Sequence, residues 1–366
     1  MQMGIRAQRN VQAIAFLGLA LASSAAAANT ITQNLSWTIN RSGVTSKYRV
    51  VAYGDSIFAG YYGSISRVAK RAAPYVDAEY AQKTWNSNVE LYRRAKSGAV
   101  ASDIYNNKIV SERSYMQATN TRIVMFEMCG NDFLHARSNL NGQSGTCNYG
   151  VLDTALTNCT KYQEKAMQFI NSNAAAGTKV KMIVNLYYPG YEADNVNTPC
   201  NDPTTGAPIN KQDKFLPYLA QSNWRACNFA AQYGFVCADA FAHYMGADYD
   251  SNGDGVVDSD GLAWRAGEAE ADYVNRISVA LRSTVRDANT HFASSGTSYD
   301  YIQSDNTHPT YTGATVGVGF FGGTGRGSGA PDYTDAQMPV GKNPVWNQLG
   351  HERMGWSSSL STPASP

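Results

Sequence analysis

Residues 48–56 read Tyr-Arg-Val-Val-Ala-Tyr-Gly-Asp-Ser. The first six are largely apolar, β-branched or aromatic, which is typical of a buried strand, and the Gly-Asp-Ser that follows is a polar turn. In open α/β sheets, ligands bind in the crevice at the carboxyl ends of the strands. This stretch therefore predicts both a central strand and a polar site at its end.

Further strand-like segments follow along the chain and alternate with helical patterns. Four more apolar segments of strand length follow, at residues 89–92, 122–128, 179–186 and 235–238. Helical patterns occupy residues 65–73, 151–176, 211–233 and 262–292, and we expect Pro74 to end the first of them. Strands that alternate with helices predict a parallel sheet that is covered on both faces. Residues 195–208 are rich in Asn, Pro and Thr, and we expect a surface loop there.

The composition excludes several classes of protein. The chain has 366 residues, of which 43% are hydrophobic and 16% are charged, and its formal net charge is +1. A near-neutral chain lacks the excess of basic residues that is typical of a nucleic-acid-binding protein. Its low charged fraction and evenly spread aromatic residues argue against disorder. Beyond the first thirty residues, no apolar run is long enough to span a bilayer.

Residues 1–28 are typical of a secretory signal peptide. Arg6 and Arg9 give a positive start, residues 11–22 form a short apolar segment, and small residues lead to a cleavage site near Ala28. We therefore expect a secreted or periplasmic protein, in a compartment where disulfides persist.

Six cysteines fit that compartment: Cys129, Cys147, Cys159, Cys200, Cys227 and Cys237. They allow fifteen complete pairings, which the sequence leaves open. Cys147 with Cys159, and Cys200 with Cys227 or Cys237, would each staple loops. The sequence has no Cys-x-x-Cys, so it does not favour a zinc or thioredoxin-type site.

Polar residues with complementary chemistry follow the predicted strands. Ser56 follows the first strand, Gly98 the second and Asn131 the third, and Asp305 and His308 lie three residues apart downstream. A serine nucleophile needs a base, the base needs a carboxylate to orient it, and the tetrahedral intermediate needs hydrogen-bond donors. Each residue alone has an ordinary structural explanation as a turn, a cap or a surface group. Their joint occurrence favours acyl transfer.

With these residues, the sequence resembles the SGNH hydrolases, also called GDSL esterases/lipases. That family is named for four residues that are matched here by Ser56, Gly98, Asn131 and His308. The matching blocks are Tyr-Gly-Asp-Ser-Ile at 53–57, Ser-Gly-Ala-Val-Ala-Ser-Asp at 97–103, Cys-Gly-Asn-Asp at 129–132 and Asp-Asn-Thr-His-Pro at 305–309. The resemblance covers residues 49–309.

The resemblance implies a role for each matching residue. Ser56 would be the nucleophile, His308 the general base and Asp305 the acid that orients it. Ser56, Gly98 and Asn131 would form the oxyanion hole. The chemistry would need no cofactor.

The resemblance also implies a flavodoxin-like three-layer α/β/α sandwich around a five-stranded parallel sheet. A single hydrolase domain would then span residues 29–356, followed by a flexible tail at 357–366. Family members often pass quickly from His-Pro to a final helix with Gly-His, whereas the matching Gly-His here comes later, at 350–351. Residues 313–344 are Gly-rich and would be an insertion that shapes the substrate site.

The function expected from these features is a secreted serine esterase that acts on short acyl or O-acetyl esters, including those of carbohydrates. One alternative is a lipase, phospholipase or acyltransferase that acts on lipid esters, for which the adjacent Phe320 and Phe321 are the only hint. A second alternative is a catalytically silent carbohydrate-binding protein, which the four signature residues disfavour. The acyl length, the alcohol, the choice between hydrolysis and transfer, and the oligomeric state are left open.

A second motif at residues 250–260 resembles the calcium loops of EF-hand, dockerin and thrombospondin-type repeats. Its candidate ligands are Asp250, Asn252, Asp254, Val256 through its carbonyl, Asp258 and Asp260. Gly255 stands where such a loop turns sharply, but Gly261 replaces the usual bidentate Glu. A plain surface turn is the alternative. We expect a structural Ca²⁺ rather than a catalytic one.

Overall fold

The computed structural model describes residues 31–61, 67–188, 190–245, 262–283, 307–309, 315–317 and 362–366. Several predicted features lie outside the described residues: the signal peptide at 1–28, the calcium loop at 250–260, Asp305 and most of the insertion at 313–344.

A six-stranded central sheet organises the molecule in the order β1-β4-β2-β5-β7-β10. Its strands are β1 (Ile31–Ile39), β2 (Lys47–Gly54), β4 (Asn88–Ser97), β5 (Thr121–Phe126), β7 (Val180–Val184) and β10 (Val236–Ala238). All neighbours are parallel except β1, which pairs antiparallel with β4 at the edge of the sheet. The predicted five-stranded parallel sheet is confirmed, and β1 extends it.

The parallel strands follow the flavodoxin-like order, in which the ligand crevice forms where the order reverses. Here that place is the carboxyl end of β2, between β4 and β5.

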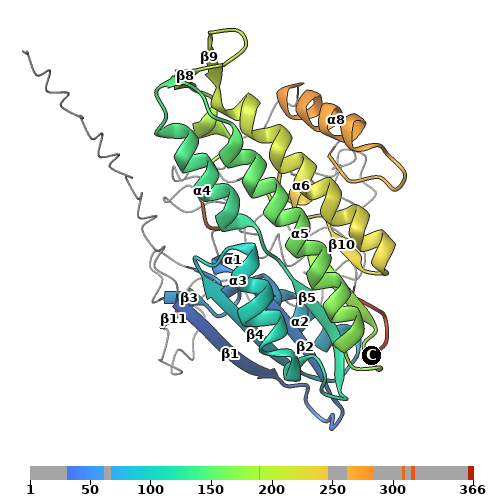
Figure 1. Cartoon of the computed structure of the whole chain (residues 1–366). Helices are drawn as coiled ribbons and strands as arrows, with labels where there is room; N and C mark the ends of the chain where they lie inside the picture. The colour runs from blue at the N-terminus through green and yellow to red at the C-terminus, as the bar shows by residue number, and fades with distance from the viewer. Residues whose placement is uncertain are drawn as a thin grey trace, which may run out of the picture.

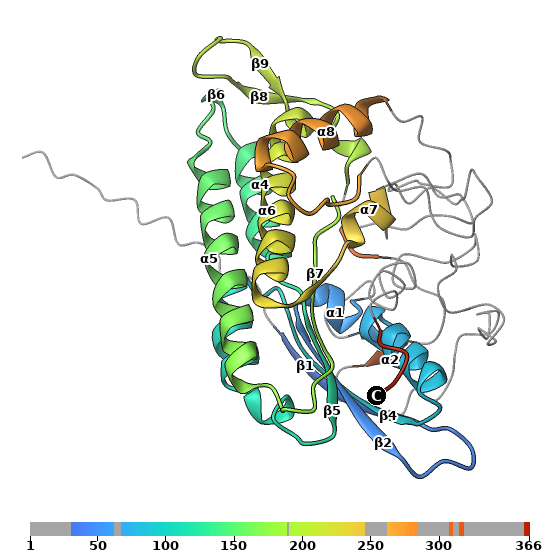
Figure 2. The same cartoon turned by 90° about the vertical axis from the view of Figure 1, so that its right-hand side faces the viewer.

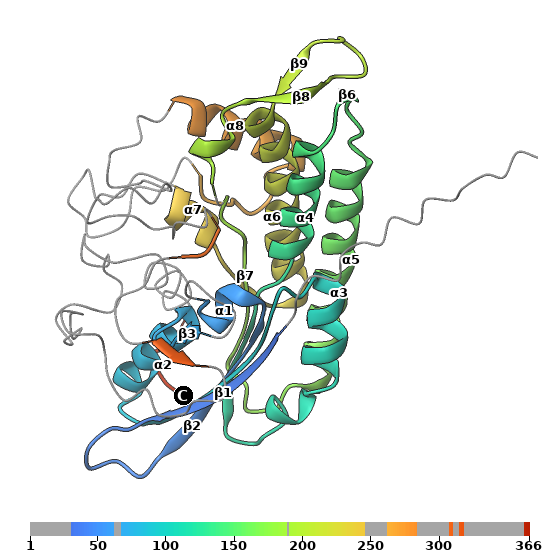
Figure 3. The ribbon, with the colours of Figure 1, turned by 90° about the vertical axis from the view of Figure 1, so that its left-hand side faces the viewer.

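Helices cover both faces of the sheet and complete the three layers (Figures 1, 2 and 3). One face carries α4 (Gly130–Asn141), α5 (Gly150–Asn173) and α6 (Lys211–Tyr233), and α8 (Glu270–Ser283) packs on α6. The other side carries α1 (Ser56–Ala59), α2 (Ala73–Thr84) and α7 (Ala240–Met245). Shorter helical segments are α3 (Ala101–Asp103), a π-helical stretch at Ile104–Val110, and 3-10 turns at Arg113–Tyr115 and Glu192–Asp194. Because both faces are covered, central residues such as Val50 and Val124 are fully buried.

The two longest predicted helices are confirmed. The pattern at 151–176 corresponds to α5, and the pattern at 211–233 corresponds to α6 with the same limits. Asn210 begins α6, since its side-chain oxygen accepts a hydrogen bond of 3.1 Å from the backbone N–H of Asp213.

The helix predicted at 65–73 is wrong. Strand β3 (Arg67–Ala69) lies there and pairs antiparallel with β11 (Thr315–Gly317). The helix comes later, as α2, and Pro74 stands in its first turn rather than after its end. A proline fits the first turn because its missing N–H would have no partner in the helix anyway.

The start of one predicted helix and the content of one predicted loop also differ from the prediction. The helix predicted from residue 262 begins at Glu270, because Gly267 adopts a left-handed φ of +81° that ends any continuous helix there. The predicted loop at 195–208 contains β8 (Asn197–Asn201) and the first residue of β9 (Pro208–Asn210). With β6 (Gly145–Thr146) these strands form a small separate sheet.

The disulfides differ from the pairs that the sequence suggested. Cys147 is bonded to Cys200, which ties β6 to β8, and Cys227 is bonded to Cys237, which ties α6 to β10. Cys159 is not the partner of Cys147, because it lies on the buried face of α5. Cys159 and Cys129, the residue before α4, are buried free thiols.

The last described residues return to α2. The hydroxyl of Thr362 donates a hydrogen bond of 2.9 Å to Asp77, and the indole N–H of Trp85 donates one of 2.7 Å to the carbonyl of Pro363. The C-terminus therefore lies beside this helix (Figure 2). Of the helices that the structure describes, none combines the length and the apolar character needed to cross a membrane.

Candidate active site

Ser56 lies in a tight turn at the end of the central strand β2. The carboxylate of Asp55 accepts the backbone N–H of Ile57 at 2.9 Å and so caps the helix that Ser56 begins. The backbone N–H of Asp55 donates to Glu127 Oε1 at 2.7 Å. Only glycine fits at position 54, since a Cβ there would lie 2.5 Å from that same oxygen. These contacts fix the turn and present Ser56, which is 6% exposed, at the strand end.

His308 meets Ser56 across 252 residues of sequence. Its Nε2 lies 2.8 Å from Ser56 Oγ, which is hydrogen-bond distance. The imidazole stacks on the ring of Tyr61, with 3.8 Å between ring centroids and 23° between planes. The hydroxyl of Tyr187 donates a hydrogen bond of 2.6 Å to the carbonyl of Thr307. The imidazole is thus held from two sides in a position from which it can take the serine proton.

Backbone donors lie beside the serine. Gly98 follows β4 with a left-handed φ of +76°, a conformation that costs glycine little. Neither the N–H of Ser56 nor that of Gly98 donates to an acceptor within the described part of the chain. Both groups are therefore available to a developing oxyanion.

The side chain of Asn131 links the strand ends. Its amide donates to the carbonyl of Ala99 at 2.9 Å and to the carboxylate of Asp55 at 3.2 Å. To donate to an oxyanion, the amide must give up one of these bonds, and the longer one is the weaker. Gly130 makes the approach to Asp55 possible, because a Cβ there would lie 2.8 Å from a carboxylate oxygen. The preceding Cys129 has a φ of +89°, a strained conformation for a residue with a side chain, and such strain often accompanies functional sites.

A pair of buried carboxyl groups lies beneath the serine. Burial raises the pKa of Glu127 well above its ordinary value, and the neighbouring Asp55 charge raises it further. Burial also raises the pKa of Asp55, although the hydrogen bond from Ile57 opposes this. Burial and the repulsion between the two carboxylates thus disfavour two negative charges under the serine turn.

Asp132 connects α4 to the loop that carries Gly98. Its carboxylate accepts the backbone N–H of Ala101 at 2.8 Å. Burial raises the pKa of this carboxyl to about 6. The contact ties the donors after β4 to the helix that bears Asn131.

The structure brings four of the predicted residues together at one edge of the sheet: Ser56, Gly98, Asn131 and His308. Asp305 and the calcium ligands are outside the described residues. Sequence reasoning missed the supporting contacts of Glu127, Tyr61 and Tyr187. The signal for Glu127 was an acid placed within the apolar segment at 122–128, and neither tyrosine carried a signal.

A family model matches most of the chain. Residues 50–316 match the model of the family described as GDSL-like Lipase/Acylhydrolase. No curated protein sequence matches the chain.

Several solved structures are similar to the chain. The lipase Lip_vut3 from a goat rumen metagenome is 18% identical over 64% of this chain and 96% of its own, with a TM-score of 0.42. Phospholipase A1 from Streptomyces albidoflavus NA297 is 18% identical over 54% of this chain and 81% of its own, with a TM-score of 0.39. The acetylxylan esterase Axe2 from Geobacillus stearothermophilus is 12% identical over 66% of this chain and 97% of its own, with a TM-score of 0.37.

Proposed function

The chain belongs to the GDSL-like lipase/acylhydrolase family, whose members are ester hydrolases, and on this premise we propose that it cleaves carboxylic esters through an acyl-enzyme on Ser56. The observation that carries the proposal is the 2.8 Å contact between Ser56 Oγ and His308 Nε2. A hydroxyl is a weak nucleophile until a base within hydrogen-bond reach takes its proton.

The first half of the reaction forms the acyl-enzyme. His308 takes the Oγ proton as Ser56 attacks the ester carbonyl, and the carbonyl oxygen becomes an oxyanion. The backbone N–H groups of Ser56 and Gly98 receive this charge, together with the side-chain amide of Asn131. The two backbone donors are already in place and stabilise the oxyanion without reorganising, whereas the amide of Asn131 first gives up its 3.2 Å bond to Asp55.

The second half releases the acyl group. His308 gives its proton to the departing alkoxide, and the alcohol leaves. Water then gives a proton to His308 as it attacks the acyl carbonyl. His308 returns that proton to Ser56 Oγ as the bond between Oγ and the acyl carbon breaks, which regenerates Ser56 and frees the acid. We assign to Asp305 the task of orienting the imidazole, because it lies three residues before His308 in the sequence and a carboxylate fixes the required tautomer.

We propose short acyl or O-acetyl esters as substrates, with carbohydrate esters among them. The competing function is hydrolysis of long-chain lipid esters. Both use the same catalytic residues, so the substrate distinguishes them.

The test is hydrolysis of p-nitrophenyl acetate, butyrate, octanoate and palmitate by the full chain and by Ser56→Ala. We expect hydrolysis of the shorter esters, and none above the background rate in the variant. Equal rates for the two proteins would overturn the serine mechanism. A preference for palmitate would favour the lipase function.

We also propose export and a structural Ca²⁺ at residues 250–260. The disulfides Cys147–Cys200 and Cys227–Cys237 support export, because such bonds persist in oxidising compartments. The N-terminal mass of the expressed protein tests export, and an uncleaved leader would contradict it.

Thermal unfolding with EGTA or with Ca²⁺ tests the binding of the ion, and an unchanged Tm would contradict it.

A further inference from the structure

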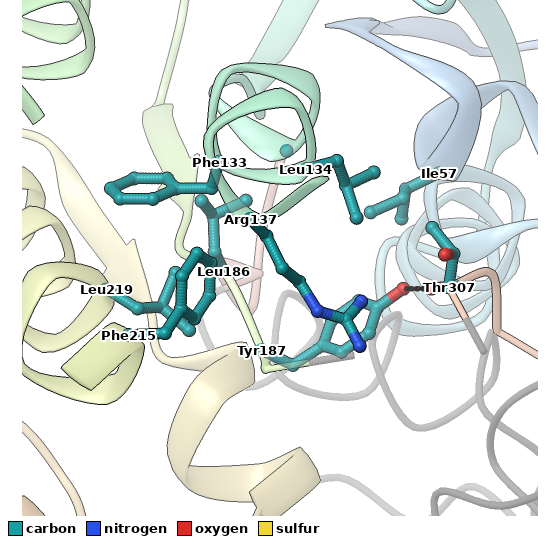
Figure 4. A pocket seen from close by; sticks show the side chains of 10 residues that line it. Ile57, Phe133, Leu134, Arg137, Leu186, Tyr187, Phe215, Leu219 and Thr307 are labelled. Carbon is teal, nitrogen blue, oxygen red and sulfur yellow. Dashed lines mark hydrogen bonds between the residues drawn. The ribbon is translucent and has the colours of Figure 1, made fainter. Parts of the chain in front are cut away.

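A small apolar cavity lies next to the catalytic residues, with a volume of about 30 Å³. Three of its lining residues are chain neighbours of site residues: Ile57 follows Ser56, Gly130 precedes Asn131 and Thr307 precedes His308. Figure 4 shows Ile57 and Thr307 at one side of the cavity.

Buried apolar side chains from two helices form the opposite wall. Phe133 of α4 and Phe215 of α6 are each 2% exposed, and their rings meet edge to face with 5.8 Å between centroids. Leu219, one turn beyond Phe215, is 1% exposed, and Leu186 closes the wall from the segment after β7 (Figure 4). A wall of this kind favours an apolar guest, since a polar group would lose its hydrogen bonds to water there.

An ion cluster limits the cavity along α4. Arg137, which lines the cavity, donates two hydrogen bonds to the carboxylate of Asp194, at 2.6 and 2.8 Å. The same carboxylate pairs with Lys211 and accepts the hydroxyl of Tyr188 at 2.9 Å. Asp194 is 1% exposed, so moving Arg137 aside would weaken the pairing of a buried charge, which is costly. The cavity therefore cannot lengthen easily in this direction.

We propose that this cavity is the acyl pocket and that Leu219 and Phe215 set its length limit. The proposal rests on the esterase function proposed above. One water needs about 10–15 Å³ of such volume, so about 30 Å³ holds roughly two waters or an alkyl tail of one to three carbons. A sugar or glycerol is too large to end there, which leaves the acyl group as the occupant. The substrate class is thus esters of acetic to butyric acid.

The test compares Leu219→Ala with Leu216→Ala over the p-nitrophenyl esters from acetate to octanoate. Both leucines belong to α6 and are equally well buried, but only Leu219 lines the cavity. We expect the wild type to lose at least tenfold in kcat/KM between butyrate and octanoate. Leu219→Ala should raise the ratio of kcat/KM for hexanoate to kcat/KM for acetate about tenfold or more. The reason is that each methylene accepted by an apolar pocket raises kcat/KM about 10- to 200-fold. Leu216→Ala should leave that ratio unchanged.

A variant that fills part of the cavity provides an independent test, because it removes no side chain from the core. Leu134 lines the cavity and is only partly buried, so Leu134→Phe can narrow the pocket without a core rearrangement. This variant should lower the ratio of kcat/KM for butyrate to kcat/KM for acetate at least threefold. Equal ratios in all variants, or a wild type that prefers octanoate, would overturn the pocket assignment while leaving Ser56-dependent hydrolysis intact. Hydrolysis that does not depend on Ser56 would overturn the proposed function as well.

Discussion

Replacing His308 by Ala is expected to lower kcat for p-nitrophenyl acetate by roughly 10⁴- to 10⁶-fold. The imidazole is the group at 2.8 Å from Ser56 Oγ, and without it the serine has no base at hand and the leaving alkoxide has no acid. Steady-state kcat and KM, with circular dichroism to confirm folding, measure the effect.

His135→Ala is the matched control for this loss. His135 is an exposed residue of α4 with no role in the proposed mechanism, so its removal should leave kcat within about twofold of the wild type. A His308→Ala enzyme that retained more than a tenth of wild-type kcat would show that another group activates the serine.

Replacing Asn131 by Ala should lower kcat about 10²- to 10³-fold with a much smaller change in KM. The amide lies between Ala99 and Asp55 at the strand ends. We propose that it stabilises the transition state by turning to the oxyanion. An effect on kcat rather than KM is the sign of an interaction made only in the transition state.

The same helix offers a control for Asn131. Asn139 is exposed on α4, and Asn139→Ala carries the same loss of an amide without touching the site. Its kcat should match the wild type. If Asn131→Ala lowered kcat no more than Asn139→Ala, the amide would have no part in oxyanion stabilisation.

Strands β2, β5 and β7 were predictable because each contains an apolar, β-branched run that is buried. The signal in β4 was shorter, because its residues alternate between buried and half-buried positions. Strand β1 gave a weaker signal. Every second residue of β1 faces inward, but one of these is the polar Gln33. Its side-chain oxygen accepts the backbone N–H of Ser97 at 3.2 Å and the hydroxyl of that residue. Such a partner is visible only once β1 and β4 are paired. Pro74 misled the helix prediction for a different reason, since a proline marks the start of one helix as readily as the end of another.

The candidate site was also predictable only in part. The residue types needed for acyl transfer were visible at the strand ends, and the parallel order of the strands placed them together. The support for them was not visible, because the role of Glu127 depends on the backbone of Asp55, 72 residues away. The cavity was likewise hidden, since α4, α6 and the segment after β7 form it only when they pack together.

The most direct measurement is the site of covalent modification by diethyl p-nitrophenyl phosphate, which phosphorylates an activated serine and releases p-nitrophenolate. The full chain is digested after reaction, and mass spectrometry locates the added diethyl phosphate. We predict a single label on Ser56, strongly slowed in His308→Ala and absent in Ser56→Ala. Inactivation of the esterase with the label on another residue and Ser56 unmodified would contradict the assignment of Ser56 as the nucleophile.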